Sequence, residues 1–152
     1  MKKKKVRRSQ HPKTKDIDIY YCNLNGAKSK QQSIQQIVEK INPAVLVFCE
    51  TKLPDDKWLQ RMLPNYSINS RATKTGKSGI AVAVKNQTFQ SVLDVTTSEN
   101  RDILVTRISH GTTTFRMILG YGPQESADVD TRENFFTELE IDVSNSKLKN
   151  GR

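Results

Sequence analysis

The feature that most constrains the fold is a run of six apolar residues, Ala44–Cys49. A short run without polar alternation is typical of a β-strand that is buried on both faces, in a sheet covered by helices or by a second sheet. Before this run, the apolar residues of 34–41 fall at i, i+3, i+4 and i+7, which predicts an amphipathic helix with Ser33 or Ser29 as its cap. Residues 17–22 alternate and predict a first strand. Strand, helix and strand form a βαβ unit, so we expect the two strands to be parallel.

After residue 66 the pattern changes from one helix-covered unit to a series of short strands. Residues 55–63 before it fit a short helix, and residues 131–148 at the far end have apolar side chains at helical spacing. The expected strands are 66–70, 79–84, 88–95, 103–109 and 113–120. A βαβ unit followed by a meander indicates an α/β or α+β domain with a mixed sheet or two packed sheets.

The net charge of +9 comes almost wholly from one end of the chain. Residues 1–15 contain eight Lys or Arg and no acid, whereas the remainder holds 17 basic and 16 acidic residues. We expect a basic disordered tail, which is either a nucleic-acid or nuclear-localisation patch or a solvated segment without a partner. The basic start lacks a following apolar segment, and no apolar run has the length of a membrane span. We therefore expect a nuclear or cytoplasmic protein that is neither secreted nor membrane-bound.

The two cysteines, Cys22 and Cys49, each lie within an apolar run. Neither has the Cys or His spacing of a zinc site. We interpret both as buried, reduced thiols.

Polar clusters follow three of the expected strands, at residues 23–26, 50–52 and 121–124. Parallel first and second strands would bring Asn23 and Glu50 to the same edge of the sheet. A carboxylate directly after an apolar strand must be hydrated, paired or bound to metal. Mg²⁺ commonly uses one or two carboxylates and completes its shell with water and phosphate. Glu50 is therefore a candidate metal ligand, and the alternative is that it pairs with Lys52 or caps the next turn.

Taken in order, these segments resemble the motifs of one family. Residues 21–26, Tyr-Cys-Asn-Leu-Asn-Gly, are similar to the first motif of the endonuclease/exonuclease/phosphatase superfamily, and residues 48–53 resemble its apolar strand ending in Glu-Thr-Lys or Glu-Thr-His. Residues 78–84 resemble its Gly-led strand, and residues 119–124 are similar to its Tyr-x-Pro-Asn segment with Gln in the last place. The resemblance covers about residues 16–148. Its polar loops and basic hairpin are most similar to the apurinic-type endonucleases of non-LTR retrotransposons.

The resemblance implies the amino-terminal portion of a four-layer αββα sandwich and Mg²⁺- or Mn²⁺-dependent hydrolysis of DNA phosphodiesters. It also implies roles for single residues: Glu50 as metal ligand, Asn23 in the metal and phosphate shell, Asn25 where relatives carry an Asp ligand, Tyr121 as hydrogen-bond donor to the scissile phosphate, and Gln124 as a phosphate contact. Without the resemblance, Tyr121 would be interpreted as a half-buried turn tyrosine. Arg71, Lys74 and Lys77 lie in a basic hairpin loop that either grips the DNA backbone or is a solvated tip.

The later motifs of the family do not occur in this sequence. It has neither a Gly-Asp-x-Asn segment nor an Asp-His pair, and His11 and His110 are poorly placed to act as a general base. We therefore expect residues 16–152 to be a partial domain that lacks its carboxyl-terminal half and leaves an apolar sheet face uncovered. Its partners would be DNA and a segment that completes the fold. The alternatives are a catalytically inactive remnant that binds nucleic acid through its tail, or another branch such as a lipid phosphatase or deadenylase.

Overall fold

The structure, a computed structural model, describes residues 16–72 and 78–149. The predicted tail and two of the predicted DNA contacts, Lys74 and Lys77, lie outside these residues. The described chain contains β1 (Ile19–Asn23), a 3₁₀ turn η1 (Lys28–Lys30), α1 (Gln31–Lys40), β2 (Val45–Cys49), α2 (Lys57–Met62), β3 (Tyr66–Arg71), β4 (Ile80–Lys85), β5 (Ser91–Asp94), β6 (Ile103–His110), β7 (Thr113–Gly120) and α3 (Val129–Lys149). None of its helices is long and apolar enough to cross a membrane.

The first sheet has the strand order β1-β2-β4-β3. The predicted parallel pairing of β1 with β2 is confirmed, and its register places Asn23 opposite Cys49. All five residues of β2 are buried. The apolar run therefore forms a central strand, with β4 antiparallel on its other side.

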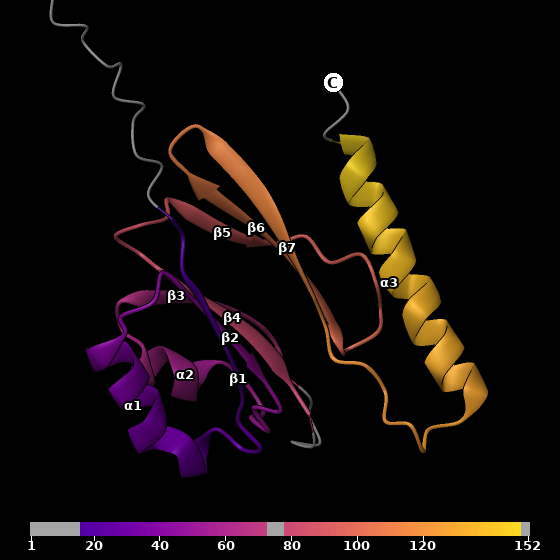
Figure 1. The fold of residues 1–152 in the computed structure, drawn as a ribbon, viewed down its shortest axis with the longest axis horizontal. Helices are drawn as coiled ribbons and strands as arrows, with labels where there is room; N and C mark the ends of the chain where they lie inside the picture. The colour runs from indigo at the N-terminus through magenta and orange to yellow at the C-terminus, as the bar shows by residue number, and fades with distance from the viewer. Residues whose placement is uncertain (1–15, 73–77, 150–152) are drawn as a thin grey trace, which may run out of the picture.

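Two helices cover one face of this sheet (Figure 1). Ile34 of α1 and Leu59 of α2 pack there with Phe48 of β2, all three at 1% exposure or less. The predicted serine cap of α1 is wrong. Ser29 lies within η1, where its Oγ donates to the Gly26 carbonyl, and Ser33 lies inside α1. The residue before α1 is Lys30, whose side chain makes no capping hydrogen bond.

The second sheet, β5-β6-β7, packs against the other face of the first. Leu104 and Ile108 of β6 are fully buried between the sheets. The outer face of this second sheet holds Phe135 of α3 against Ile103 and Val105. Helices, sheet, sheet and helix form the four layers of an αββα sandwich, as expected, and Figure 1 shows them in sequence.

The expectation of an uncovered apolar sheet face is wrong for the described residues, because each sheet has cover on both faces. The cover by α3 is narrower than its sequence suggests. Phe135 is buried and Leu139 packs beside it, but Phe136 and Val143 remain 59% and 37% exposed. The helix thus meets the sheet along one thin stripe.

Candidate active site

Three loops meet where β1 and β2 end and β4 begins. The Gly26 and Ala27 amides donate to the carbonyls of Glu50 and Thr51 at 2.8 and 2.9 Å, and the Thr51 amide donates to the Gly79 carbonyl at 3.1 Å. The predicted meeting of Asn23 and Glu50 at one sheet edge is therefore confirmed. The hydrogen-bonded loop backbones hold the side chains in fixed positions.

Backbone conformation is unusual at several residues of this edge. Glu50 and Lys52 have φ of 52° and 51°, in the left-handed region that side chains rarely adopt. Gly79 has φ 117°, and a Cβ there would lie 2.4 Å from Thr51 Oγ1. Such conformations cost free energy and persist where the surrounding structure enforces them. The Gly79 position explains why a glycine leads the β4 segment.

Glu50 is the centre of the side-chain cluster. The hydroxyl of Tyr121 donates to Glu50 Oε1. The hydrogen bond from Tyr121, then one from the Asn23 side chain, and the nearby charge of Lys52 hold the pKa of the Glu50 carboxyl below its usual value, against a smaller effect of burial. The same contact with Glu50 raises the pKa of Tyr121 to about 12. Glu50 is therefore ionised and Tyr121 protonated at neutral pH.

The amides of the first loop complete this cluster. Asn23 Oδ1 accepts from the Asn25 amide at 3.1 Å, and Asn25 Oδ1 accepts from Lys52 Nζ at 2.7 Å. The sequence left open that Lys52 pairs with Glu50. In the structure, Lys52 instead donates its hydrogen bond to the side-chain oxygen of Asn25. Lys52 was not predicted as a site residue, although its place two residues after Glu50 could have indicated it.

Tyr121 reaches the cluster from the second sheet. Its amide donates to the Asp102 carbonyl at 2.8 Å, which joins the residue after β7 to the residue before β6. Asp102 was also not predicted as a site residue. The sequence did contain a signal, because Asp102 directly precedes the apolar run of β6, much as Glu50 directly follows that of β2. Burial raises the pKa of the Asp102 carboxyl, while a hydrogen bond from Ser78 and the charge of Arg71 oppose the rise.

The cysteines lie below this cluster within the first sheet. Both are free, but only Cys49 is buried, whereas Cys22 is half-buried. Cys49 Sγ and the Tyr21 hydroxyl lie 2.8 Å apart, and this contact raises the pKa of Tyr21 to about 12. The prediction of buried thiols therefore holds for Cys49 alone.

Two predicted contact residues lie away from the cluster's hydrogen bonds. Gln124 is exposed in the loop before α3, where its carbonyl accepts from the Ala127 amide at 2.9 Å. Arg71 is half-buried at the end of β3, and its Nη1 donates to the carbonyls of Ser98 and Ile103 at 2.8 and 3.0 Å. Part of this guanidinium is therefore engaged in joining the two sheets.

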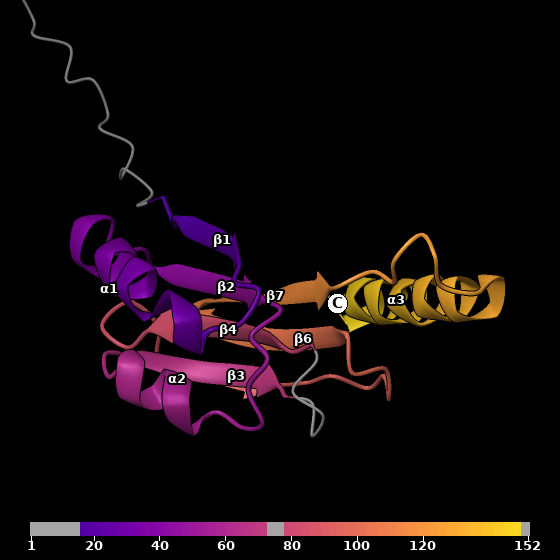
Figure 2. The ribbon, with the colours of Figure 1, turned by 90° about the horizontal axis from the view of Figure 1, so that it is seen from below.

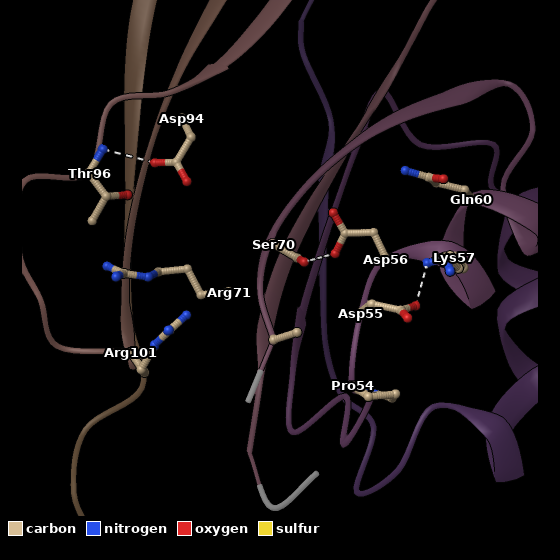
Figure 3. A pocket seen from close by; sticks show the side chains of 11 residues that line it. Pro54, Asp55, Asp56, Lys57, Gln60, Ser70, Arg71, Asp94, Thr96 and Arg101 are labelled. Atoms are coloured by element: carbon tan, nitrogen blue, oxygen red, sulfur yellow. Dashed lines mark hydrogen bonds between the residues drawn. The ribbon is translucent and has the colours of Figure 1, made fainter. Parts of the chain in front are cut away.

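A surface pocket of about 760 Å³ lies beside Arg71 (Figure 3). Its walls bring together acidic and basic side chains. The acidic ones are Asp55 and Asp56 before α2 and Asp94 at the end of β5, and the basic ones include Arg71 at the end of β3 and Arg101 in the segment after β5. The mixed charges favour no single class of ligand. The pocket contains none of the residues of the Glu50 cluster.

The cluster fits a divalent cation in part. Glu50 provides an ionised carboxylate, and Asn23 and Asn25 provide amide oxygens, which are the ligand types that Mg²⁺ prefers. Within residues 16–72 and 78–149, no three His, Cys, Asp or Glu side chains are grouped closely enough to hold a metal ion. The described residues therefore offer one side of a hard-cation site, whose remaining positions would need water, phosphate or another carboxylate.

No family model matches the chain, and no curated protein matches it in sequence. Solved structures share its fold. They include the 3′ phosphatase NExo from Neisseria bound to a product DNA hairpin (21% identity, TM-score 0.68, 86% of this chain and 52% of that one) and the catalytic domain of Xenopus laevis APE2 (17%, 0.64, 88% and 55%). An AP endonuclease from Archaeoglobus fulgidus is similar over 80% of this chain and 48% of its own, with 21% identity and a TM-score of 0.60.

These similarities define the fold as that of the AP endonuclease, exonuclease and phosphatase enzymes. The chain spans about half the length of the structures it matches.

Proposed function

We propose that this chain provides one half of a Mg²⁺- or Mn²⁺-dependent nuclease site that hydrolyses phosphodiester bonds in DNA, as in the endonuclease domains of non-LTR retrotransposons. The observation that carries the proposal is the ionised Glu50 carboxylate, held by Tyr121 and Asn23 at the end of the strands. Asn23, Glu50 and Tyr121 are the residues to which the sequence resemblance gives these roles. Solved structures of this fold include a protein named as a 3′ phosphatase, bound to a product DNA hairpin, and one named as an AP endonuclease.

In this proposal, Glu50 and the amide oxygen of Asn23 would hold the cation, and Asn25 would add its oxygen only by giving up the hydrogen bond from Lys52. When bound, the cation would neutralise charge that develops on the phosphoryl oxygens and lower the pKa of a coordinated water. Tyr121 remains protonated at neutral pH and can donate its hydrogen bond to a phosphate oxygen. Lys52, fixed by Asn25, adds positive charge to the same edge. Gln124, Arg71, Lys74 and Lys77 would contact phosphates further along the backbone without reading sequence.

Nicking of supercoiled plasmid by the purified full chain tests this activity. We expect nicking with Mg²⁺ that stops with EDTA and falls at least about 100-fold in Glu50→Ala, because such groups act as a unit. The matched control is Glu39→Ala, which removes an exposed carboxylate from α1. Nicking that survives Glu50→Ala, or that is absent from the wild type, would contradict the proposal for this chain.

A second candidate is a catalytically inactive protein that binds nucleic acid through its basic tail. It is favoured by the single carboxylate of the cluster and by the eight Lys or Arg in residues 1–15. Removing residues 1–15 would then weaken DNA binding and reduce its dependence on salt concentration. DNA binding that is unchanged without the tail would exclude this candidate. Whether the tail is a nuclear-localisation signal is a separate question, tested by transferring residues 1–15 to a reporter protein.

A further inference from the structure

The Tyr121 hydroxyl donates to Glu50 Oε1, and its position there depends on how the second sheet ends. Tyr121 directly follows β7, and the last register pair of β6 with β7 joins Ile103 to Gly120. The hydrogen bond from the Tyr121 amide to the Asp102 carbonyl, at 2.8 Å, extends this ladder by one residue. Because the ends of elements open more easily than their centres, Tyr121 is held only as firmly as Asp102.

Asp102 is in turn held by the first sheet. Its carboxyl accepts a hydrogen bond from the Ser78 hydroxyl, in the loop that leads into β4. The Ser78 carbonyl accepts from the amide of Lys52, two residues after Glu50, at 2.8 Å. Asp102 is therefore joined to Tyr121 by its main chain and, through Ser78, to the loop after β2 by its side chain.

Two further contacts fix the backbone around Asp102. The Asp102 amide donates to Asn100 Oδ1 at 2.9 Å, and Arg71 Nη1 donates to the neighbouring carbonyl of Ile103 at 3.0 Å. The carboxyl itself is buried at a cost in free energy, because its Oδ1 has almost no accessible surface and no hydrogen-bond partner among residues 16–72 and 78–149. A buried polar atom without a partner is rare in native proteins, so its presence indicates a role other than stability.

We propose that Asp102 is a positioning residue that holds the Tyr121 hydroxyl on the Glu50 carboxylate by linking the end of the second sheet to the loop after β2. The alternative is that Asp102 only stabilises the start of β6. The alternative predicts that a substitution changes stability throughout the molecule, whereas the positioning role predicts a local change at Tyr121.

Hydrogen–deuterium exchange of the full chain labelled with ¹⁵N-tyrosine, followed by NMR without metal or DNA, tests this role. In Asp102→Ala we expect the Tyr121 amide to exchange at least about tenfold faster, because the end of the ladder loses its link to Ser78. The Tyr66 amide, which donates to the Leu63 carbonyl at 3.1 Å, should keep its exchange rate and reports any loss of global stability. The Tyr121 signal is identified by its absence from Tyr121→Phe.

Two further variants separate the hydrogen bond from the fold. Asp102→Asn keeps an oxygen that can accept from Ser78, so the Tyr121 amide should exchange at the wild-type rate. Ser78→Ala removes the donor and should reproduce the faster exchange of Asp102→Ala. The matched control is Glu99→Ala, which removes an exposed carboxylate from the same segment and should leave the rate unchanged. A rise that is absent from Asp102→Ala or Ser78→Ala, or that Tyr66 or Asp102→Asn shows equally, would overturn the proposal.

The consequence for catalysis rests on the proposed function. A displaced Tyr121 hydroxyl donates less well to a phosphate oxygen, so Asp102→Ala should lower kcat for plasmid nicking at least about tenfold and change KM little. Asp102→Asn should nick like the wild type. The two proposals fail separately. Faster exchange in Asp102→Ala without any nicking by the wild type contradicts only the nuclease, and unchanged exchange with wild-type nicking contradicts only the positioning role.

Discussion

The two sides of the sandwich are closed in different ways. The free edges of β1 and β7 lie on one side of the sandwich, which we call the open side (Figure 2). Opposite it, β3 lies over β5 and β6, and polar groups join the sheets. Asn69 Nδ2 donates to Thr106 Oγ1 at 2.6 Å in a buried position, and Arg71 reaches the carbonyl of Ile103 in β6 and that of Ser98 in the segment before β6. We call this the closed side. On the open side, the two sheets are joined at the end of the strands by the Tyr121–Glu50 hydrogen bond. The closed side is thus joined by polar contacts within the chain, while apolar side chains of β1 and β7 on the open side stay partly exposed.

The largest expected difference between the sides concerns leucines in the space between the sheets. Leu104 is fully buried, so Leu104→Ala should lower the free energy of unfolding by about 2–5 kcal/mol. Leu119 on the open side is only half-buried, and Leu119→Ala should cost about 1 kcal/mol in the monomer. Urea denaturation of both variants measures the difference. Equal losses at low protein concentration would show that the open side is already sealed.

The buried amide–hydroxyl pair of the closed side should give the next largest effect. Thr106→Val keeps the side-chain shape but leaves the Asn69 amide without its acceptor, which should cost about 1–3 kcal/mol. Replacing both partners, as in Asn69→Leu with Thr106→Val, should recover part of that loss because no polar group remains unsatisfied. A double variant that is less stable than the sum of the singles would contradict this role of the pair.

A substitution of Arg71 distinguishes a structural role of this residue from contact with DNA. Arg71→Lys keeps the charge but loses the donor geometry that holds the Ser98 and Ile103 carbonyls, so thermal stability should fall by about 1 kcal/mol. DNA affinity, measured by fluorescence anisotropy, should change little, because lysine keeps the charge that would contact a phosphate. A variant of unchanged stability and weaker DNA binding would show that Arg71 acts through phosphate contact and not by joining the sheets.

The smallest effect is a pH dependence at Asp102. Burial raises the pKa of Asp102, so between its ordinary value of 3.8 and the raised value the folded chain binds more protons than the unfolded chain. Stability therefore falls as pH rises through this window and is level above it. Asp102→Asn should be more stable than the wild type at neutral pH, with the difference in Tm shrinking toward pH 4. Glu99→Gln, on the same loop, is the control for loss of one exposed carboxylate.

Much of the fold follows from local patterns in the chain. The apolar run around Phe48 and the helical spacing of 34–41 predicted elements that the structure contains, because each pattern reports burial within one element. Ends were less well predicted: the expected strand at 88–95 is shortened to Ser91–Asp94, and Ser29 does not cap α1. These boundaries depend on contacts with distant residues.

The residues of the candidate site likewise fall into those that the sequence indicated and those that it did not. The residue types at Asn23, Glu50 and Tyr121 were evident from the sequence, since polar residues directly after apolar strands mark the edge of a sheet. Asp102 and Lys52 acquired their places only through packing, because their partners lie far along the chain.

The sequence by itself determined the order of strands and helices, the parallel βαβ unit and the polar residues at its edge. Only the tertiary structure decided that both faces of each sheet are covered while one side stays open. The pattern of apolar residues in the sequence predicts which side chains face a core, but it does not predict which strand at a sheet edge will lack a neighbour. That depends on how the two sheets align, with β3 over β5 and β1 beside β7, and this alignment is set by contacts between segments distant in sequence.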